Sequence, residues 1–267
     1  MRLAIIGLPL SGKTTIFNAL TRGDQPTTTN GGRFDVHTAV VDVPDRRVED
    51  LSGLFKPRKT TFAKVTYVDV AGLDGSNGSN GNGNGKNGNG KNGLAGPLLN
   101  QLSQMDGFVH VVRCFDNPSV PHPAGSVDPA RDLAVMDLEL ILNDLILVER
   151  KLERLDDERR KGVGRDKAQV ERETALFQKL HAHLSGERPL RDLELSAEEG
   201  RLLSGYGLLT RKPVLVLFNL AEGQEPPAIV LEAPHTRALA LQGKLEMDLA
   251  QLPPDEAREF MDEYGIQ

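Results

Sequence analysis

Short apolar runs recur along this chain and alternate with segments in which apolar residues repeat every three or four positions. The runs have the length and β-branched composition of strands, and they cover residues 2–6, 37–43, 62–70, 108–113, 213–218 and 238–241. Apolar residues at helical spacing occur in 13–20, in 94–102 and in the stretch after residue 242. Strands that alternate with helices predict an α/β fold with a mainly parallel sheet, whose binding sites lie at the carboxyl ends of the strands.

A longer helical pattern begins at Asp128-Pro129, an aspartate N-cap followed by a proline in the first turn. Apolar residues then recur at steps of three and four, as in a coiled-coil seam: Leu138, Ile141, Leu145, Val148, Leu152 and Leu155. The pattern breaks at 161–164. The apolar side of a second helix carries Val170, Phe177, Leu180 and Leu184, with polar Glu173 interrupting it. Two such helices joined by a glycine turn predict an antiparallel hairpin.

A glycine-rich segment directly follows the first strand. It reads Gly7-Leu8-Pro9-Leu10-Ser11-Gly12-Lys13-Thr14-Thr15 and fits G-x-x-x-x-G-K-[ST], the phosphate-binding loop of nucleoside triphosphatases. Glycines let the backbone turn around a phosphate, and successive amides at a helix N-terminus point at its oxygens. We expect Lys13 to contact the β- and γ-phosphates and the Thr14 hydroxyl to hold Mg²⁺. An ordinary strand-to-helix turn is the alternative, and the strand and helix that flank the segment argue against it.

The strand 62–70 ends in Asp69-Val70-Ala71-Gly72. An aspartate at the carboxyl end of a strand beside a phosphate-binding loop is the position that holds Mg²⁺ through water, so we predict a metal site at Thr14 and Asp69. Gly72 is placed to offer its amide to the γ-phosphate and to move when that phosphate leaves. The same four residues also occur in common strand-to-turn sequences.

Two segments near this site lack the apolar residues of a core. Residues 21–35 are polar and glycine-rich, which predicts a loop, and threonines 27–29 within it are weak candidates for a further Mg²⁺ ligand. Residues 74–93 are almost all Gly and Asn, which predicts a flexible insertion directly after Gly72.

Composition narrows the class of protein. The 267 residues are 39% hydrophobic and 26% charged, and the single cysteine, Cys114, fits a reducing compartment, so we expect a cytoplasmic protein with no membrane partner. A net charge of −6 argues against DNA or any general coating of nucleic acid. A local basic cluster at the hairpin tip is either a solvated turn or an RNA contact; it comprises Arg159, Arg160, Lys161, Arg165 and Lys167.

The strand 213–218 leads into Asn219-Leu220-Ala221-Glu222. GTPases carry N-K-x-D here, and the aspartate accepts two hydrogen bonds from guanine. The glutamate of this chain is one methylene longer and would crowd guanine, whereas an Asn amide can pair with the N6/N7 edge of adenine. We therefore favour ATP over GTP, with the base surrounded by Asn219, Leu220, Glu222 and the pair Gln242-Gly243.

Taken together, these motifs resemble the Obg-like ATPases of the YchF branch. The segments that carry the resemblance are 7–15, 43–47, 69–73, 110–115 and 219–222. The resemblance implies a translation-factor-class P-loop ATPase that hydrolyses ATP slowly and associates with ribosomes. It also implies that hydrophobic Leu73 replaces the glutamine that orients water in other switches, which leaves His122 as the polar candidate for catalysis. The family usually carries a C-terminal TGS domain, and we expect no counterpart of it among these 267 residues.

These observations predict a P-loop domain formed by 1–127 and 205–267, with a helical coiled-coil insertion at 128–204 and the Gly/Asn insertion at 74–93. The leading interpretation is a Mg²⁺-dependent ATP-hydrolysing switch. Two alternatives remain: a nucleotide-binding adaptor that docks RNA or protein through the hairpin tip without hydrolysis, and a GTPase with an atypical base-recognition motif.

Overall fold

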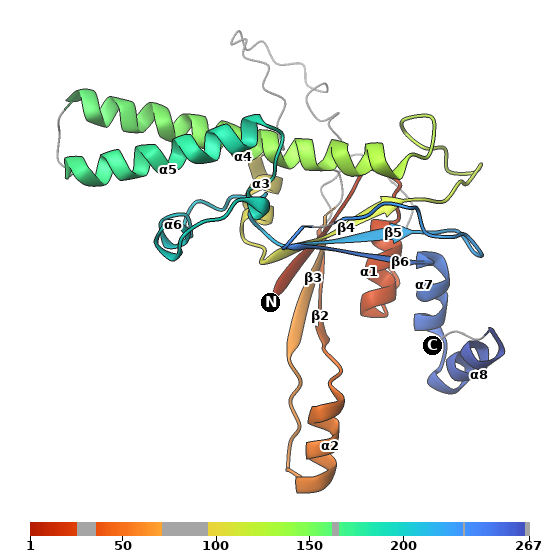
Figure 1. Cartoon of the computed structure of the whole chain (residues 1–267). Helices are drawn as coiled ribbons and strands as arrows, with labels where there is room; N and C mark the ends of the chain where they lie inside the picture. Colours follow the sequence, from red (N-terminus) through yellow and green to blue (C-terminus); the bar gives the residue numbers. More distant parts are fainter. Residues whose placement is uncertain (26–35, 71–95, 162–165, 232, 265–267) are drawn as a thin grey trace.

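The chain folds around one six-stranded sheet (Figure 1). The structure is a computed structural model, and it describes residues 1–25, 36–70, 96–161, 166–231 and 233–264. The strands are β1 (Arg2–Ile6), β2 (Val36–Asp42), β3 (Lys64–Val70), β4 (Gly107–Arg113), β5 (Val214–Asn219) and β6 (Thr236–Leu241). Their order is β2-β3-β1-β4-β5-β6, and all neighbouring pairs except β2 with β3 are parallel. The predicted α/β fold with a mainly parallel sheet is confirmed.

Helices cover both faces of the sheet (Figure 1). On one face α1 (Lys13–Thr21) packs beside α7 (Gly243–Gln251), and α8 (Pro254–Tyr264) follows α7 at the end of the chain. On the other face lie α3 (Gly96–Ser103) and the first turns of α4 (Pro129–Lys161). The parallel arrangement places the ends of β1, β3 and β5 at one edge, where the predicted site residues also lie.

A helix that the sequence pattern did not indicate joins β2 to β3. This helix, α2 (Arg46–Phe55), begins after Asp45, whose side chain accepts a hydrogen bond from the Arg47 amide at 2.9 Å. Because β2 and β3 are antiparallel, the chain leaves the sheet along β2 and returns along β3, with α2 at the far end (Figure 1). No residue of α2 is buried.

The predicted helical hairpin is present, formed by α4 and α5 (Lys167–Ser185). Ile141, Val148 and Leu155 are buried against apolar residues of α5. One member of the predicted seam was wrong: Leu138 is 43% exposed. The first turns of α4 pack on the sheet through Met136 and Leu140, so Leu138 points away from both the sheet and α5.

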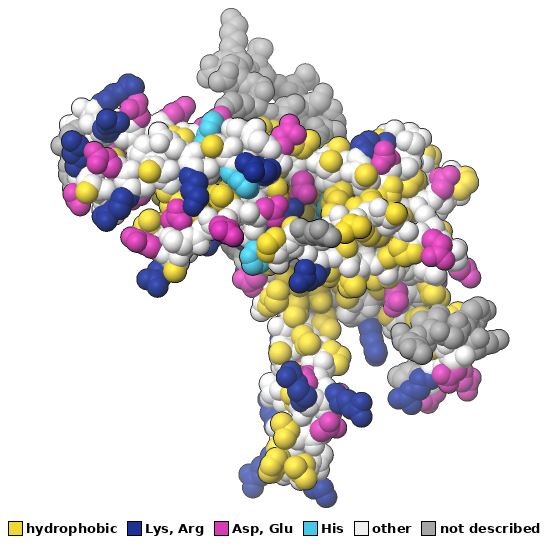
Figure 2. Space-filling view, in the orientation of Figure 1, with side chains coloured by type: hydrophobic (Ala, Val, Ile, Leu, Met, Phe, Trp, Pro, Cys, Tyr) yellow, Lys and Arg dark blue, Asp and Glu magenta, His cyan; other side chains and the backbone are white. Residues whose placement is uncertain are grey.

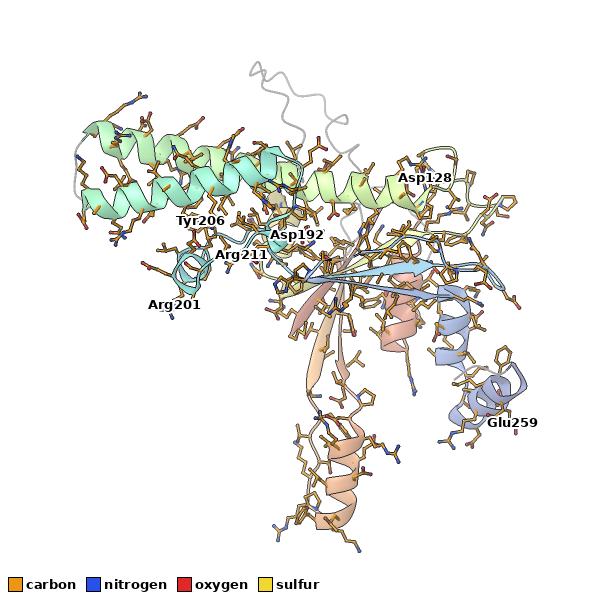
Figure 3. The ribbon with its side chains drawn as sticks, in the orientation of Figure 1. Asp128, Asp192, Arg201, Tyr206, Arg211 and Glu259 are labelled. Atoms are coloured by element: carbon orange, nitrogen blue, oxygen red, sulfur yellow. The ribbon has the colours of Figure 1, made fainter. Side chains whose placement is uncertain are left out.

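Glu173, which interrupts the apolar stripe of α5, has a structural partner. Its carboxylate lies 3.0 Å from the Lys151 ammonium, and both side chains are largely buried. Lys151 also lies over the rings of Phe177 and Tyr206, which pack edge to face at 5.0 Å. Figure 3 shows labelled Tyr206 close to α5. The polar residue in the seam therefore joins the two helices to the segment after them.

A buried carboxylate fixes α4 to the segment that precedes β5 (Val214–Asn219). Asp144 accepts hydrogen bonds from the Leu209 and Thr210 amides, both at 2.8 Å, and from the Thr210 hydroxyl. Burial raises the pKa of Asp144 to about 6, although these donors favour the charged form. Nearby, η1 (Leu190–Asp192) contributes Arg191, which pairs with Asp137 of α4 at 2.7 Å.

The short helix α6 (Ala197–Leu202) begins at a capping box, in which Ser196 and Glu199 bond reciprocally. Among the residues that the structure describes, no helix has both the length and the apolar character needed to cross a membrane. The boundaries at 128 and 204 stay a prediction.

Candidate nucleotide site

The loop between β1 and α1 has a backbone that requires glycine at two positions. Gly7 and Gly12 have φ values of 150° and 95°. A Cβ atom on Gly7 would lie 2.4 Å from the Val111 carbonyl oxygen, and one on Gly12 would lie 2.3 Å from the Asn219 side-chain nitrogen. The glycines of the sequence motif thus allow the loop to pass close to β4 and β5.

The N-terminus of α1 is arranged to receive an anion. Its N-cap residue is Gly12, which offers no side-chain cap, and the first turn contains no acidic residue. First-turn amides of a helix have no acceptor within the helix, and together with the helix dipole they favour a phosphate group. The Lys13 ammonium lies back over the loop and donates to the Gly7 and Leu8 carbonyls at 3.1 and 2.9 Å.

Thr14 and Asp69 meet beside the loop. The Thr14 hydroxyl donates to Asp69 Oδ2 at 2.8 Å, because the register of the parallel pair β1 and β3 brings Asp69 opposite Ile5. Asp69 is 1% exposed, and its other oxygen, Oδ1, has no hydrogen-bond partner among the described residues. Burial raises the pKa of Asp69, opposed by the Thr14 hydrogen bond and the charge of Lys13.

An oxygen of this kind fits a hard cation, because a bound cation or its water would satisfy the buried carboxylate. Within the described ranges no cluster of three or more His, Cys, Asp or Glu side chains could hold a metal. Mg²⁺ binds nucleotides through one or two protein oxygens, phosphate oxygens and waters, and Thr14 and Asp69 offer two protein oxygens of this kind.

Asn219 connects the phosphate loop to the first residue of α7. Its amide nitrogen donates to the Ser11 carbonyl at 3.0 Å, and its amide oxygen accepts from the Gly243 amide at 3.0 Å. The side chain is buried, and both ends of the amide are therefore engaged with backbone. This geometry supports a positioning role for Asn219, in addition to the predicted contact with the base.

The other residues predicted to surround the base differ in exposure. Leu220 is 8% exposed and belongs to the main core, whereas Glu222 is exposed to solvent. Gln242 is the N-cap of α7, and its buried Oε1 atom has no hydrogen-bond partner among the described residues. The sequence interpretation missed Gln224, whose side chain bonds to the Ala221 amide and the Cys114 carbonyl and so fixes this turn.

His122 lies in the loop between β4 and α4. Its Nδ1 accepts from the Ala124 amide at 3.1 Å, so the proton is on Nε2, which donates to Asp132 of α4 at 2.8 Å. Both side chains are 4% exposed. In this arrangement each ring nitrogen is engaged in a hydrogen bond, and neither is free to act on a water molecule.

Arg113, to which sequence reasoning gave no role, links the phosphate loop to the loop that carries His122. Its guanidinium donates to the carbonyls of Phe115, Val120 and, at 3.4 Å, Leu10. The signal in the sequence was a cation at the end of the strand 108–113, which is apolar apart from His110. Burial raises the pKa of the neighbouring Cys114 thiol to about 12, which fits a packing role.

Some predicted site residues lie outside the described residues. They are Gly72, Leu73, threonines 27–29, Arg165 and the Gly/Asn segment 74–93.

The parallel sheet, the glycine loop and the helical hairpin together define a P-loop protein with a helical insertion. The chain is 32% identical over 274 residues to the "Ribosome-binding ATPase YchF" of Escherichia coli O157:H7, covering 100% of this chain and 71% of that protein. The relative of that name in Bacillus subtilis is 31% identical, covering 98% of this chain and 71% of that protein. "Obg-like ATPase 1" of Oryza sativa subsp. indica is also 31% identical, with 67% of its length covered.

A solved structure described as the "Structure of the Schizosaccharomyces pombe YchF GTPase" matches with a TM-score of 0.72 and 26% identity, covering 100% of this chain and 72% of that one. No family model matches. The chain belongs to the YchF and Obg-like ATPase family, as its motifs indicated.

Proposed function

We propose that this protein is a nucleotide-dependent switch that binds ATP with Mg²⁺, hydrolyses it slowly and associates with ribosomes. One observation carries the proposal: the Thr14 hydroxyl and the Asp69 oxygen that has no partner among the described residues lie beside a glycine loop at the N-terminus of α1. The names of the bacterial relatives, which state ribosome binding and ATPase activity, support the same function.

The residues of the loop would act mainly by position and charge. Backbone amides of Gly12 to Thr15 bind the β- and γ-phosphates, and Lys13 exchanges the Gly7 and Leu8 carbonyls for phosphate oxygens. Thr14 and Asp69 would hold Mg²⁺, which supplies positive charge to the phosphates when bound. Water attacks the γ-phosphate in line, and the preorganised donors stabilise the charge that develops.

Slow hydrolysis follows from the state of the catalytic candidates. Leu73 cannot orient water, and His122 would have to give up its hydrogen bonds with Asp132 or Ala124 before it could do so. A partner that rearranges this loop would accelerate the reaction, as expected of a switch.

For the base we propose adenine. The amide oxygen of Gln242 is buried without a partner among the described residues and matches the N6 amino group of adenine as a donor. Guanine carries an acceptor at the equivalent ring position, and Glu222 stands where GTPases place a shorter aspartate.

The choice of base is tested by displacing a fluorescent ATP analogue with unlabelled ATP and GTP. We expect ATP to displace it at about tenfold lower concentration, equivalent to one hydrogen bond of discrimination. The double variant Leu220→Lys/Glu222→Asp restores the guanine motif, so it should reduce or reverse the preference for ATP over GTP. Tighter binding of GTP by the unmodified chain would refute the assignment of adenine.

A further inference from the structure

The segment between β2 and β3, here called the arm (residues 43–63), projects from the sheet and carries α2 at its end (Figure 1). The arm contains five basic and three acidic residues, a net charge of +2. The whole chain has a net charge of −6, so the rest of the molecule carries −8. The arm is therefore a cationic projection on an acidic protein, and its charge favours a polyanionic partner.

The end of the arm exposes large apolar side chains. Leu54 and Phe55 are each 73% exposed, and Leu51 is 55% exposed. Leu54 and Phe55 follow Leu51 by three and four residues, so the three side chains lie on one side of α2. Figure 2 shows hydrophobic side chains gathered among Lys and Arg at the end of the arm. Because α2 buries none of its residues, folding does not account for this apolar surface.

The cations of the arm are mostly available to a partner. Within the described part of the chain, Arg46, Lys56, Arg58 and Lys59 form no ion pair, and only Arg47 is held, by Asp45. Three of the four follow Phe55 within four residues, in the sequence Phe55-Lys56-Pro57-Arg58-Lys59. An exposed aromatic ring beside clustered cations is the arrangement that binds single-stranded nucleic acid, through base stacking and phosphate contacts.

The hairpin tip, which also carries basic residues, differs in this respect. Arg160, Lys161 and Lys167 each pair with a carboxylate one turn away on the same helix. These pairs reduce the positive field that the tip presents to phosphate groups.

We propose that the arm binds single-stranded RNA, with Phe55 stacked on a base and Lys56, Arg58 and Lys59 contacting phosphates. This inference rests on the proposed association with ribosomes. It assigns the RNA contact of that association to the arm. A protein with an acidic groove would also meet the charge, but the row of cations after the aromatic ring favours a chain of phosphates.

The test is fluorescence anisotropy of a labelled 12-nucleotide oligouridine with the full chain. We expect the variant Lys56→Glu/Arg58→Glu/Lys59→Glu to bind at least tenfold more weakly and to lower the slope of log K against log salt by about 2, since each single-strand phosphate contact contributes about 0.7. Phe55→Ala should weaken binding about tenfold, whereas Phe55→Tyr, which keeps an aromatic ring, should bind as the unmodified chain does. The matched control, Arg159→Glu/Arg160→Glu/Lys161→Glu at the hairpin tip, makes the same change in charge and should bind within about threefold of the unmodified chain.

Three outcomes would overturn the proposal. The first is binding weaker than about 100 µM, the weak limit of non-specific association. The second is unchanged binding by the arm variants. The third is full binding by Phe55→Leu with no salt dependence, because neither base stacking nor phosphate contacts would then account for the binding. Phe55 is exposed, so its variants keep the test valid even where the triple reversal fails to fold.

ATP hydrolysis is measured on the same samples. Hydrolysis should be unchanged in every arm variant, because none of these residues belongs to the nucleotide site. Failure of RNA binding with hydrolysis intact would refute only the RNA-binding site proposed on the arm. Failure of hydrolysis with arm-dependent RNA binding intact would refute only the proposed activity.

Discussion

Lys13→Ala is expected to lower single-turnover ATP hydrolysis by about 100-fold or more and to weaken ATP binding. The reason is that the ammonium supplies the one side-chain charge of the loop, and removing a preorganised group from a developing anion costs about this much. Lys13 is half-buried and bonds to the Gly7 and Leu8 carbonyls, which solvent or neighbouring amides can satisfy after its removal. We therefore expect the melting temperature to change little.

Lys64→Ala is the matched control, because Lys64 is 59% exposed and, among the residues that the structure describes, pairs only with Asp42. Exposed pairs contribute little to stability, and this variant should hydrolyse ATP at the unmodified rate. Parental hydrolysis by Lys13→Ala would show that the loop does not form the catalytic site.

The largest loss of stability among the site residues is expected for Asn219→Ala. The change leaves the Ser11 carbonyl and the Gly243 amide without the partner that now joins them, and both groups lie in a buried region. Each unsatisfied group costs about 1–3 kcal/mol, so losing the partner of both should lower the free energy of unfolding by about 2–6 kcal/mol. At about 2 °C per kcal/mol for a chain of this size, that corresponds to a decrease of about 4–12 °C in melting temperature.

The same change should weaken ATP binding, because the Ser11 carbonyl anchors the loop to β5 and α7. Asn219→Asp separates the two bonds: it can accept from Gly243 but cannot donate to Ser11, so the loop should remain displaced. Asn100→Ala on the exposed face of α3 is the control and should alter stability by less than about 0.5 kcal/mol. A melting temperature for Asn219→Ala within 1 °C of the unmodified chain, measured by thermal unfolding, would contradict this role.

The strands and the phosphate loop could be predicted from the sequence because their signals are local. Apolar runs defined all six strands to within about two residues, and the glycines of the loop have the conformations that their chemistry implies. The hairpin was equally visible, since its apolar period extends over several turns. Leu138 was misassigned because periodicity does not reveal where α4 leaves the sheet and joins α5.

Other features depend on contacts between distant residues or on surfaces without a core pattern. Asn219 bonds to Ser11 across 208 positions, and no local pattern indicates that bond. Arg113 and Asp132 gain their partners only when β4 and α4 are in place. Helix α2 was missed because it buries none of its residues, so burial does not constrain its pattern as it does in core helices. These non-local features shape the site, and sequence alone could name its residues without giving their partners.

The most direct test of the account is single-turnover ATP hydrolysis by the unmodified chain and by Asp69→Asn across a range of Mg²⁺ concentrations. The central claim is that Thr14 and Asp69 form the metal position beside the loop. We expect slow hydrolysis that requires Mg²⁺, and a 10- to 100-fold higher Mg²⁺ requirement for Asp69→Asn, the usual effect of losing a group that orients metal-bound water. Hydrolysis that is independent of Mg²⁺, or identical Mg²⁺ curves for the two proteins, would contradict the claim.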